Sequence, residues 1–227
     1  MQSRNPASRR RPPVSKLTIR HVLYLLILHC IGSAIICGAA NFAIACAMYR
    51  TRAAGPYLWN ISNTLAGDAG VTVIVQVILT WVIDTALVCG DVRRGIIAPL
   101  SASSQPRTKN LWSRIKLCFL SPDMDIFAPG LTLLQRIWRL ICSAIRGLIL
   151  CVPVFCIWWP IAIGMLYGIG SSRSGSEVRY NKWPAPELFK LVYGFTMGLV
   201  TTPVYSYTAL KAMGRTFERD AELTTQY

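Results

Sequence analysis

The sequence has few of the groups on which enzymes and metalloproteins depend. It holds two histidines, His21 and His29, and it has no HExxH motif, no CxxC pair, no phosphate-binding glycine loop and no nucleophile elbow. On one helix the two histidines would lie ~12 Å apart along the axis, which is too far to share a metal ion. We therefore predict a protein that is not an enzyme, with no catalytic residues, no cofactor and no metal site.

Acidic residues are also scarce, because ten Asp and Glu stand against 24 Lys and Arg and give a net charge of +14. Such an excess can indicate nucleic-acid binding, but most of these basic residues flank long apolar stretches. At such positions a basic side chain sets membrane topology and gains ~1 kcal/mol from anionic leaflet lipids. We expect the anionic lipids of the cytosolic leaflet as partners, and no nucleic acid.

Charge is almost absent from four apolar stretches, in which Asp84 is the only acidic or basic residue apart from histidine. Each stretch has about the 20 residues that a helix needs to cross a hydrocarbon core ~30 Å thick. The sequence therefore predicts an all-α polytopic membrane protein, a four-helix transmembrane bundle with spans over 22–49, 69–90, 147–170 and 191–210. This domain, residues 21–213, lies between a disordered basic tail over 1–20 and a second tail over 214–227.

The basic residues are distributed unevenly around these spans. The N-terminal tail, the loop over 91–146 and the segment after the fourth span carry 18 of them, and the other two loops carry six. Positive charge resists translocation, so both termini and the 91–146 loop are predicted to be cytosolic, in the endoplasmic reticulum and endomembranes or in the plasma membrane. The sequence Asn60-Ile61-Ser62 lies in a predicted exterior loop, which makes Asn60 a candidate glycosylation site.

None of the eight cysteines lies in a predicted exterior loop, so we expect no disulfide framework. Cys89, Cys118 and Cys142 lie at or near the cytosolic face beside basic residues. Cysteines at such positions are candidates for S-acylation. The other interpretation is that they are small apolar packing residues.

The predicted cytosolic loop contains two amphipathic segments. Over residues 110–120, apolar residues recur near helical spacing among basic ones; they are Leu111, Trp112, Ile115, Cys118 and Phe119. From Leu131 a second amphipathic helix is predicted, with arginines on its other side, and it continues into the third span. For both segments, contact with lipid and packing on the underside of the bundle remain open.

The second predicted span has a polar residue at every fourth position: Asp68, Thr72, Gln76, Thr80 and Asp84. Side chains four residues apart share a helix face, so these five form one polar stripe. The stripe must face other helices or water, because polar groups turned to lipid cost several kcal/mol. Two interpretations stay open: hydrogen bonding between helices, or a path for protons, ions or solutes.

Asp84 and His29 are expected at similar depth near the cytosolic side of the bundle, and Arg146 stands at the cytosolic entrance of the third span with a side chain long enough to reach inward. A buried carboxylate without a partner is costly, so we predict that Asp84 pairs with Arg146, with His29 and Thr80 nearby. The alternative is that Asp84 and Arg146 extend separately, one to the headgroups and the other to lipid phosphate.

Small residues at four-residue spacing predict close helix packing in the other three spans. They are Ala39, Ala43 and Ala47 on the first, Gly164 and Gly168 on the third, and Gly194 and Gly198 on the fourth. Because the two glycine pairs fall at similar depth, we expect the third and fourth spans to meet at these glycines.

The stretch from Asn63 to Gln76, continued by Leu79-Thr80-Trp81, resembles the second-span signature of an uncharacterised fungal family of small multi-pass membrane proteins, a domain of unknown function. The similarity covers residues 56–95. It implies a fungal source and a multi-span fold. No activity is established for that family, so the resemblance implies no mechanism and no catalytic residues.

These patterns predict an integral membrane protein without catalytic activity. We expect a scaffold or accessory subunit that binds lipids or an unknown membrane-protein partner through its basic amphipathic cytosolic loop. The alternative is a small transporter or channel that uses the polar stripe and is necessarily oligomeric. A homo-oligomer is compatible with both functions.

Overall fold

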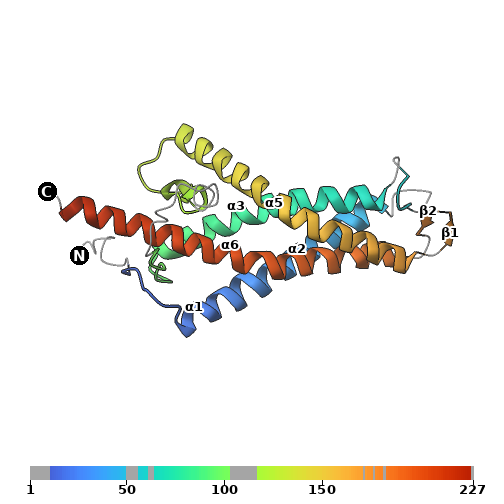
Figure 1. Cartoon of the computed structure of the whole chain (residues 1–227), viewed down its shortest axis with the longest axis horizontal. Coiled ribbons are helices and arrows are strands. Elements are labelled where there is room, and N and C mark those ends of the chain that lie inside the picture. The colour runs from blue at the N-terminus through green and yellow to red at the C-terminus, as the bar shows by residue number, and fades with distance from the viewer. Residues whose placement is uncertain are drawn as a thin grey trace. The chain divides into compact units, whose positions relative to one another are not determined.

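The computed structural model describes residues 11–49, 56–60, 64–102, 117–170, 172–175, 177–180 and 183–225. The chain is mostly helical (Figure 1). Its elements are α1 Ile19–Leu23, η2 Tyr24–Ile31, α2 Gly32–Tyr49, α3 Leu65–Arg93, η4 Pro122–Met124, α5 Leu133–Ile169, β1 Ser172–Ser174, β2 Glu177–Arg179 and α6 Ala185–Thr225. The element η2 is a π-helical stretch that joins α1 to α2 without a break.

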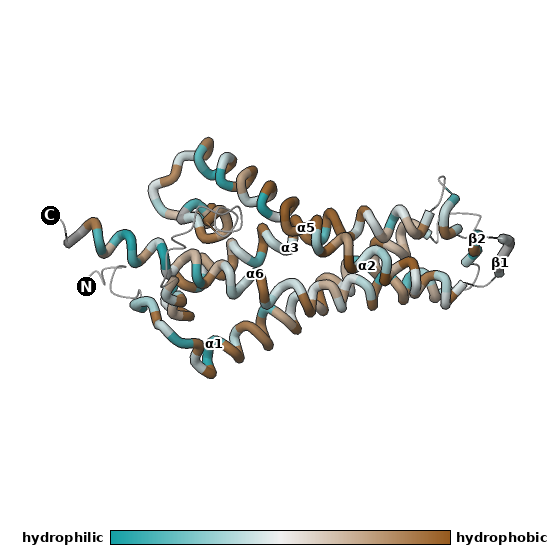
Figure 2. Tube along the Cα trace, in the orientation of Figure 1, coloured by the Kyte–Doolittle hydropathy of each residue, from teal (hydrophilic) through white to brown (hydrophobic). Residues whose placement is uncertain are grey.

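Three helical stretches are long and apolar enough to cross a membrane: Ile19–Tyr49, Leu65–Arg93 and Leu133–Ile169. They contain the first three predicted spans. Helix α6 is longer than any of them but is not among the three. Figure 2 shows that α5 carries long hydrophobic segments, whereas the last turns of α6 are hydrophilic. The described structure is thus compatible with a membrane protein.

The chain divides into two compact units, each built from discontinuous segments. Unit 1 comprises Met1–His29, Trp81–Arg146 and Thr202–Tyr227, and unit 2 comprises Cys30–Thr80 and Gly147–Thr201. Helices α3, α5 and α6 each contribute one part to both units.

The core of unit 1 is organised around Trp81. This side chain is buried, and the rings of Phe119 and Tyr205 meet it edge-on at centroid distances of 5.4 Å each. Phe119 belongs to the first predicted amphipathic segment, so this part of it packs on the protein rather than on lipid. The rest of that segment, through residue 116, lies outside the described residues.

Residues 11–20 differ from the disordered tail that the sequence predicts. The backbone N–H of Val14 donates to Pro99 O at 3.0 Å, and the N–H of Ser101 donates to Val14 O at 2.9 Å. His21 Nε2 lies 2.9 Å from Ala98 O, and Arg20 donates to Ile96 O at 2.7 Å. These backbone and side-chain hydrogen bonds order a segment that has little apolar surface to bury. The prediction for residues 1–10 lies outside the described residues.

In unit 2 the loop after α5 forms a short antiparallel hairpin. Ser172 pairs with Arg179 and Ser174 pairs with Glu177. Gly175 has φ 60° in the connection, a conformation that glycine adopts without strain. The N–H of Leu58 bonds Val178 O at 2.9 Å, so β2 also holds the segment that precedes α3.

Close helix packing occurs in unit 2, but between other partners than those predicted. Helix α2 buries Ala34, Gly38, Asn41 and Ala45, whereas the predicted stripe of Ala39, Ala43 and Ala47 is exposed. A Cβ on Gly198 would lie 3.2 Å from Ala34 Cα, and one on Gly38 would lie 3.1 Å from Leu191 O. Helices α2 and α6 therefore make the close contact.

Gly164 and Gly168 of α5 do not take part in this contact. A Cβ added at either position would meet no atom within 4 Å. The predicted meeting of α5 and α6 at their glycine pairs is therefore not found, because the α6 pair is already occupied by α2.

Candidate functional site

The polar stripe of α3 begins in unit 2 with a buried ion pair. Lys190 Nζ lies 2.9 Å from Asp68 Oδ2 and also donates to Thr72 Oγ1, and the hydroxyl of Tyr49 donates to the same Asp68 oxygen. Lys190 is almost completely buried although it is a lysine. The pair connects α6 with α3, and Tyr49 adds the end of α2.

Gln76, also in unit 2, lies in the middle of the stripe, and both the oxygen and the nitrogen of its side-chain amide form hydrogen bonds. Its Oε1 accepts from Asn41 Nδ2 at 2.8 Å, and its Nε2 donates to Gly194 O at 2.9 Å. Asn41 also donates to Cys37 O at 2.8 Å. Thr80 Oγ1 lies 3.8 Å from Cys37 Sγ. One amide of α3 thereby holds α2 and α6 at the place where these two helices are closest.

Asp84 belongs to unit 1, and both of its carboxylate oxygens are engaged. Oδ1 contacts His29 Nδ1, and Oδ2 accepts from Ser206 Oγ at 2.6 Å. His29 lies in the π-helical stretch, and the ring of Tyr24 packs on it at a centroid distance of 4.6 Å. Three helical elements therefore meet at one buried carboxylate.

The predicted pair of Asp84 with Arg146 is not formed. Arg146 is buried, and its Nη1 has no hydrogen-bond partner among the described residues. His29, which the sequence placed only nearby, is the direct partner of Asp84. Each oxygen of Asp84 is instead engaged by a side chain from another helical element, His29 from η2 and Ser206 from α6.

The candidate modification sites differ in their access to solvent or lipid. Cys118 and Asn60 are exposed, and Cys142 is partly exposed. Cys89 is fully buried, so its thiol cannot be reached for acylation in this structure. For Cys89 the packing interpretation therefore fits the geometry.

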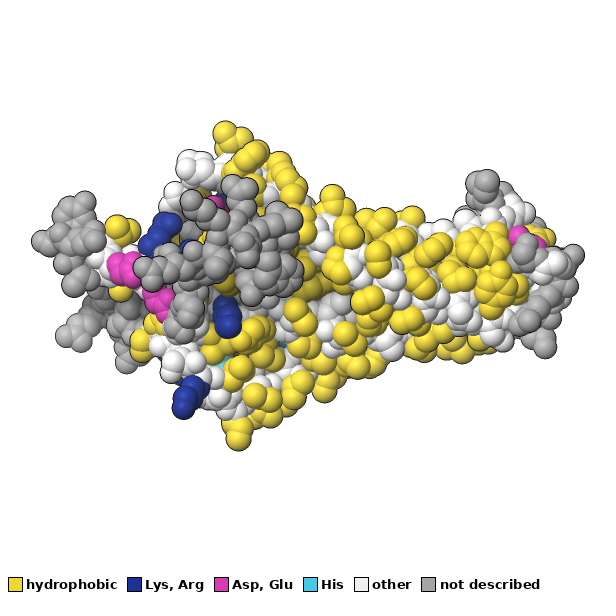
Figure 3. Space-filling model, in the orientation of Figure 1, with side chains coloured by type: hydrophobic (Ala, Val, Ile, Leu, Met, Phe, Trp, Pro, Cys, Tyr) yellow, Lys and Arg dark blue, Asp and Glu magenta, His cyan; other side chains and the backbone are white. Residues whose placement is uncertain are grey.

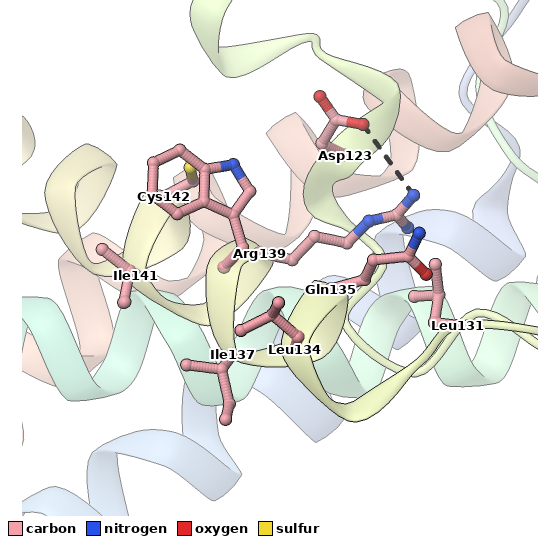
Figure 4. A pocket seen from close by; sticks show the side chains of 9 residues that line it. Asp123, Leu131, Leu134, Gln135, Ile137, Arg139, Ile141 and Cys142 are labelled. Atoms are coloured by element: carbon pink, nitrogen blue, oxygen red, sulfur yellow. Dashed lines mark ion pairs between the residues drawn. The ribbon is translucent and has the colours of Figure 1, made fainter.

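A second candidate site lies at the beginning of α5, in unit 1. Leu133, Leu134 and Trp138 are large apolar side chains that are 75%, 76% and 66% exposed. Figure 4 shows Arg139 reaching toward Asp123, with which it forms an ion pair of 3.9 Å. A cavity of about 580 Å³ is lined by this part of the chain, including Trp138 and Cys142. On the face drawn in Figure 3, hydrophobic side chains cover much of the helical surface.

The contacts of the stripe involve residues that the sequence analysis did not single out. In the sequence Lys190 is one of the six basic residues of the predicted exterior loops, and Tyr49 and Ser206 carry no distinguishing pattern. Asn41 did carry a signal, because an amide inside an apolar stretch must find a partner. Its position identifies the buried face of α2 better than the alanine spacing does.

The fold and these sites define a class: a mostly helical protein, compatible with membrane insertion, whose polar residues join its helices. Residues 129–210 match the family described as "Protein of unknown function (DUF2456)". This match lies outside residues 56–95, on which the sequence resemblance rests.

Two fungal relatives extend the similarity. Over an alignment of 200 residues the chain is 32% identical to an uncharacterised protein of Schizosaccharomyces pombe, and this alignment covers 86% of this chain and 38% of that protein. Over an alignment of 236 residues it is 25% identical to an uncharacterised protein of Saccharomyces cerevisiae, and this alignment covers 81% of this chain and 75% of that protein. No solved structure matches the chain. The resemblance to an uncharacterised fungal family with a domain of unknown function is thereby confirmed.

Proposed function

We propose that this protein is a four-span integral membrane protein with both termini in the cytosol, and that it serves as a non-catalytic scaffold or accessory subunit. It binds lipids or a protein partner through the basic, amphipathic beginning of α5. The observation that carries this proposal is the exposed apolar surface of Leu133, Leu134 and Trp138 next to arginines of the same helix.

The pattern of exposed and buried side chains on α6 supports a fourth span. Leu188, Val192, Val200 and Val204 face outward on it, whereas Thr202 and Ser206 are fully buried. Several hydroxyls of α6 bond a backbone carbonyl four residues earlier, such as Thr196 to Val192 O and Thr208 to Val204 O. A helix with an apolar outer face and satisfied hydroxyls is suited to hydrocarbon.

The contacts of the polar stripe support a structural role over transport. Asp68, Gln76 and Asp84 each hold a side chain or carbonyl from another helix. Polar groups that are already paired with protein have little capacity left for a moving ion. Interhelical bonds of this kind are worth about 0.6–2 kcal/mol each in membranes.

The proposal is tested by purifying the full chain in a mild neutral detergent and identifying the bound lipids and proteins by mass spectrometry. The variant Leu134→Ala/Trp138→Ala truncates two of the large exposed side chains at the beginning of α5. The matched control is Ile36→Ala/Val152→Ala, which removes side chains that are 70% and 64% exposed elsewhere. We expect bound lipids or proteins to be lost from the first variant and retained by the control. Equal recovery from wild type and both variants would contradict the proposal.

A further inference from the structure

A groove of about 700 Å³ lies within unit 1 between the C-terminal half of α3 and the beginning of α5. Its volume is typical of ligand pockets, ~300–1,000 Å³. Its walls are mainly aliphatic, with Ile83 and Leu87 from α3 and Leu133, Ile137 and Leu140 from α5. These side chains are about half exposed or more, so the groove is open along its length.

The groove has the depth of one membrane leaflet. Its α3 wall runs from Val82 to Arg93 at the C-terminus of that helix, and eleven residue steps of an α-helix span ~16 Å. Half of a hydrocarbon core ~30 Å thick is about the same length. A ligand that reaches from the basic end of α3 to Val82 would therefore reach the middle of the bilayer.

Three arginines line the same groove: Arg93, Arg94 and Arg136. Arg93 is already neutralised, since it lies 3.3 Å from Asp125 and donates to Phe127 O. Asp91, the carboxylate among the lining residues, accepts from Tyr24 at 2.8 Å. No ion pair to Arg94 or Arg136 is found in the part of the chain that the structure describes. The basic end of the groove thus holds two guanidinium groups, Arg94 and Arg136, that form no ion pair with a described carboxylate, and its three arginines outnumber the one carboxylate among the lining residues, Asp91.

We propose that this groove binds one anionic glycerophospholipid, with an acyl chain along the aliphatic wall and the headgroup phosphate at Arg94 and Arg136. Guanidinium groups bind phosphate oxygens in a two-pronged geometry that a lysine does not offer. The aliphatic wall binds hydrocarbon, and in a membrane a phospholipid carries both chemistries in one molecule. This inference rests on the proposed function, because it assigns the lipid and its position to the surface at the beginning of α5.

The structure offers a variant that fills the groove without disturbing the helix. A Cβ at Gly90, one of the lining residues of α3, would meet no atom within 4 Å. Gly90→Phe therefore places a ring in the groove, and the loss of a helical glycine favours folding. Gly164→Phe is the control for added bulk, because Gly164 is equally open but is not among the lining residues of the groove.

The experiment titrates the purified full chain in neutral detergent with palmitoyl-oleoyl phosphatidylglycerol or with the phosphatidylcholine of the same acyl chains, and counts bound lipid by native mass spectrometry. We expect phosphatidylglycerol to bind more tightly. Arg94→Gln/Arg136→Gln should lose about tenfold or more in affinity, because it removes charge-assisted bonds to the phosphate. The charge-matched control Arg215→Gln/Arg219→Gln should keep wild-type affinity. Gly90→Phe should weaken binding of both lipids, and Gly164→Phe neither.

Three results would overturn the inference, and they are distinguishable. The first is that both double variants reduce the wild-type preference for phosphatidylglycerol equally while Gly90→Phe has no effect; lipid then binds the basic surface and not the groove. The second is equal binding of both lipids by the wild-type chain, which rejects a site for an anionic lipid. The third is binding of neither lipid, which rejects the groove and also the lipid-binding part of the proposed function.

Discussion

Asp84 is the residue whose environment most clearly sets the arrangement of unit 1. Its carboxylate is buried and engages His29 from η2 and Ser206 from α6. Removing one member of such a buried pair leaves a polar group without its partner and typically costs about 3–5 kcal/mol when the remaining group is charged. Asp84 is therefore a structural link between helices.

A double-mutant cycle tests this link. We expect His29→Ala and Asp84→Ala each to destabilise the protein in detergent, and the double variant to cost less than their sum by about 0.5–3 kcal/mol. The same cycle with Arg146→Ala in place of His29→Ala should come closer to additivity, because Arg146 makes no recorded bond to Asp84. Chemical unfolding of the purified variants measures both couplings. A larger coupling for Arg146 than for His29 would restore the pair predicted from sequence.

The sequence predicts which residues of the candidate site are polar and buried, but not what they contact. The i, i+4 spacing places five side chains on one face of α3, and Thr72, Gln76, Thr80 and Asp84 are indeed buried. Their partners come from other helices, and which helix faces α3 depends on packing that no local pattern encodes. The reach of its side chain favours Arg146 as the partner of Asp84 in the sequence, whereas in the structure His29 of η2 contacts Asp84.

At the scale of elements, α2 and α6 pack closely against each other in unit 2. Gly194 is required there, because a Cβ would lie 2.4 Å from Asn41 Nδ2 and 2.9 Å from Cys37 O. The same contact carries the bonds from Gln76 to Asn41 and to Gly194 O. Packing and hydrogen bonding at this point therefore depend on one another.

Replacing single glycines separates the two GxxxG motifs. We expect Gly194→Ala to destabilise the protein by about 1–3 kcal/mol, because an added methyl group forces packed atoms apart. Gly164→Ala has open space and should be neutral, or more stable by up to about 1 kcal/mol from helix propensity. Thermal unfolding in detergent compares the two variants. Equal destabilisation by both would mean that the α5 glycines are also packed.

The two motifs look alike in the sequence, and only the structure tells them apart. A GxxxG pattern indicates that some backbone can approach closely, but it does not name the partner helix. Sequence order favoured the neighbouring span, α5, whereas α6 packs on α2. The helix positions themselves follow well from the apolar stretches, because length and hydropathy are local properties.

For the whole molecule, the number of spans is the central question. Three helices are long and apolar enough by composition, and α6 is not among them because its apolar stretch is interrupted by several threonines and tyrosines and by Ser206. The mean hydropathy of a helix counts these residues as polar whether their side chains face inward or outward. The structure turns Thr202 and Ser206 inward and leaves Val200 and Val204 outside. The exposed side chains of α6 are therefore more apolar than the average composition of the helix. This difference is the basis for proposing a fourth span.

The topology of the two termini tests this account most directly, because four spans place them on the same side of the membrane and three place them on opposite sides. Tags at both ends of the full chain are probed in cells after selective permeabilisation of the plasma membrane, with a luminal protein as the control for intact endomembranes. The account predicts that both tags are accessible from the cytosol, in agreement with 18 of 24 basic residues on that side. An accessible N-terminal tag with a protected C-terminal tag would contradict it.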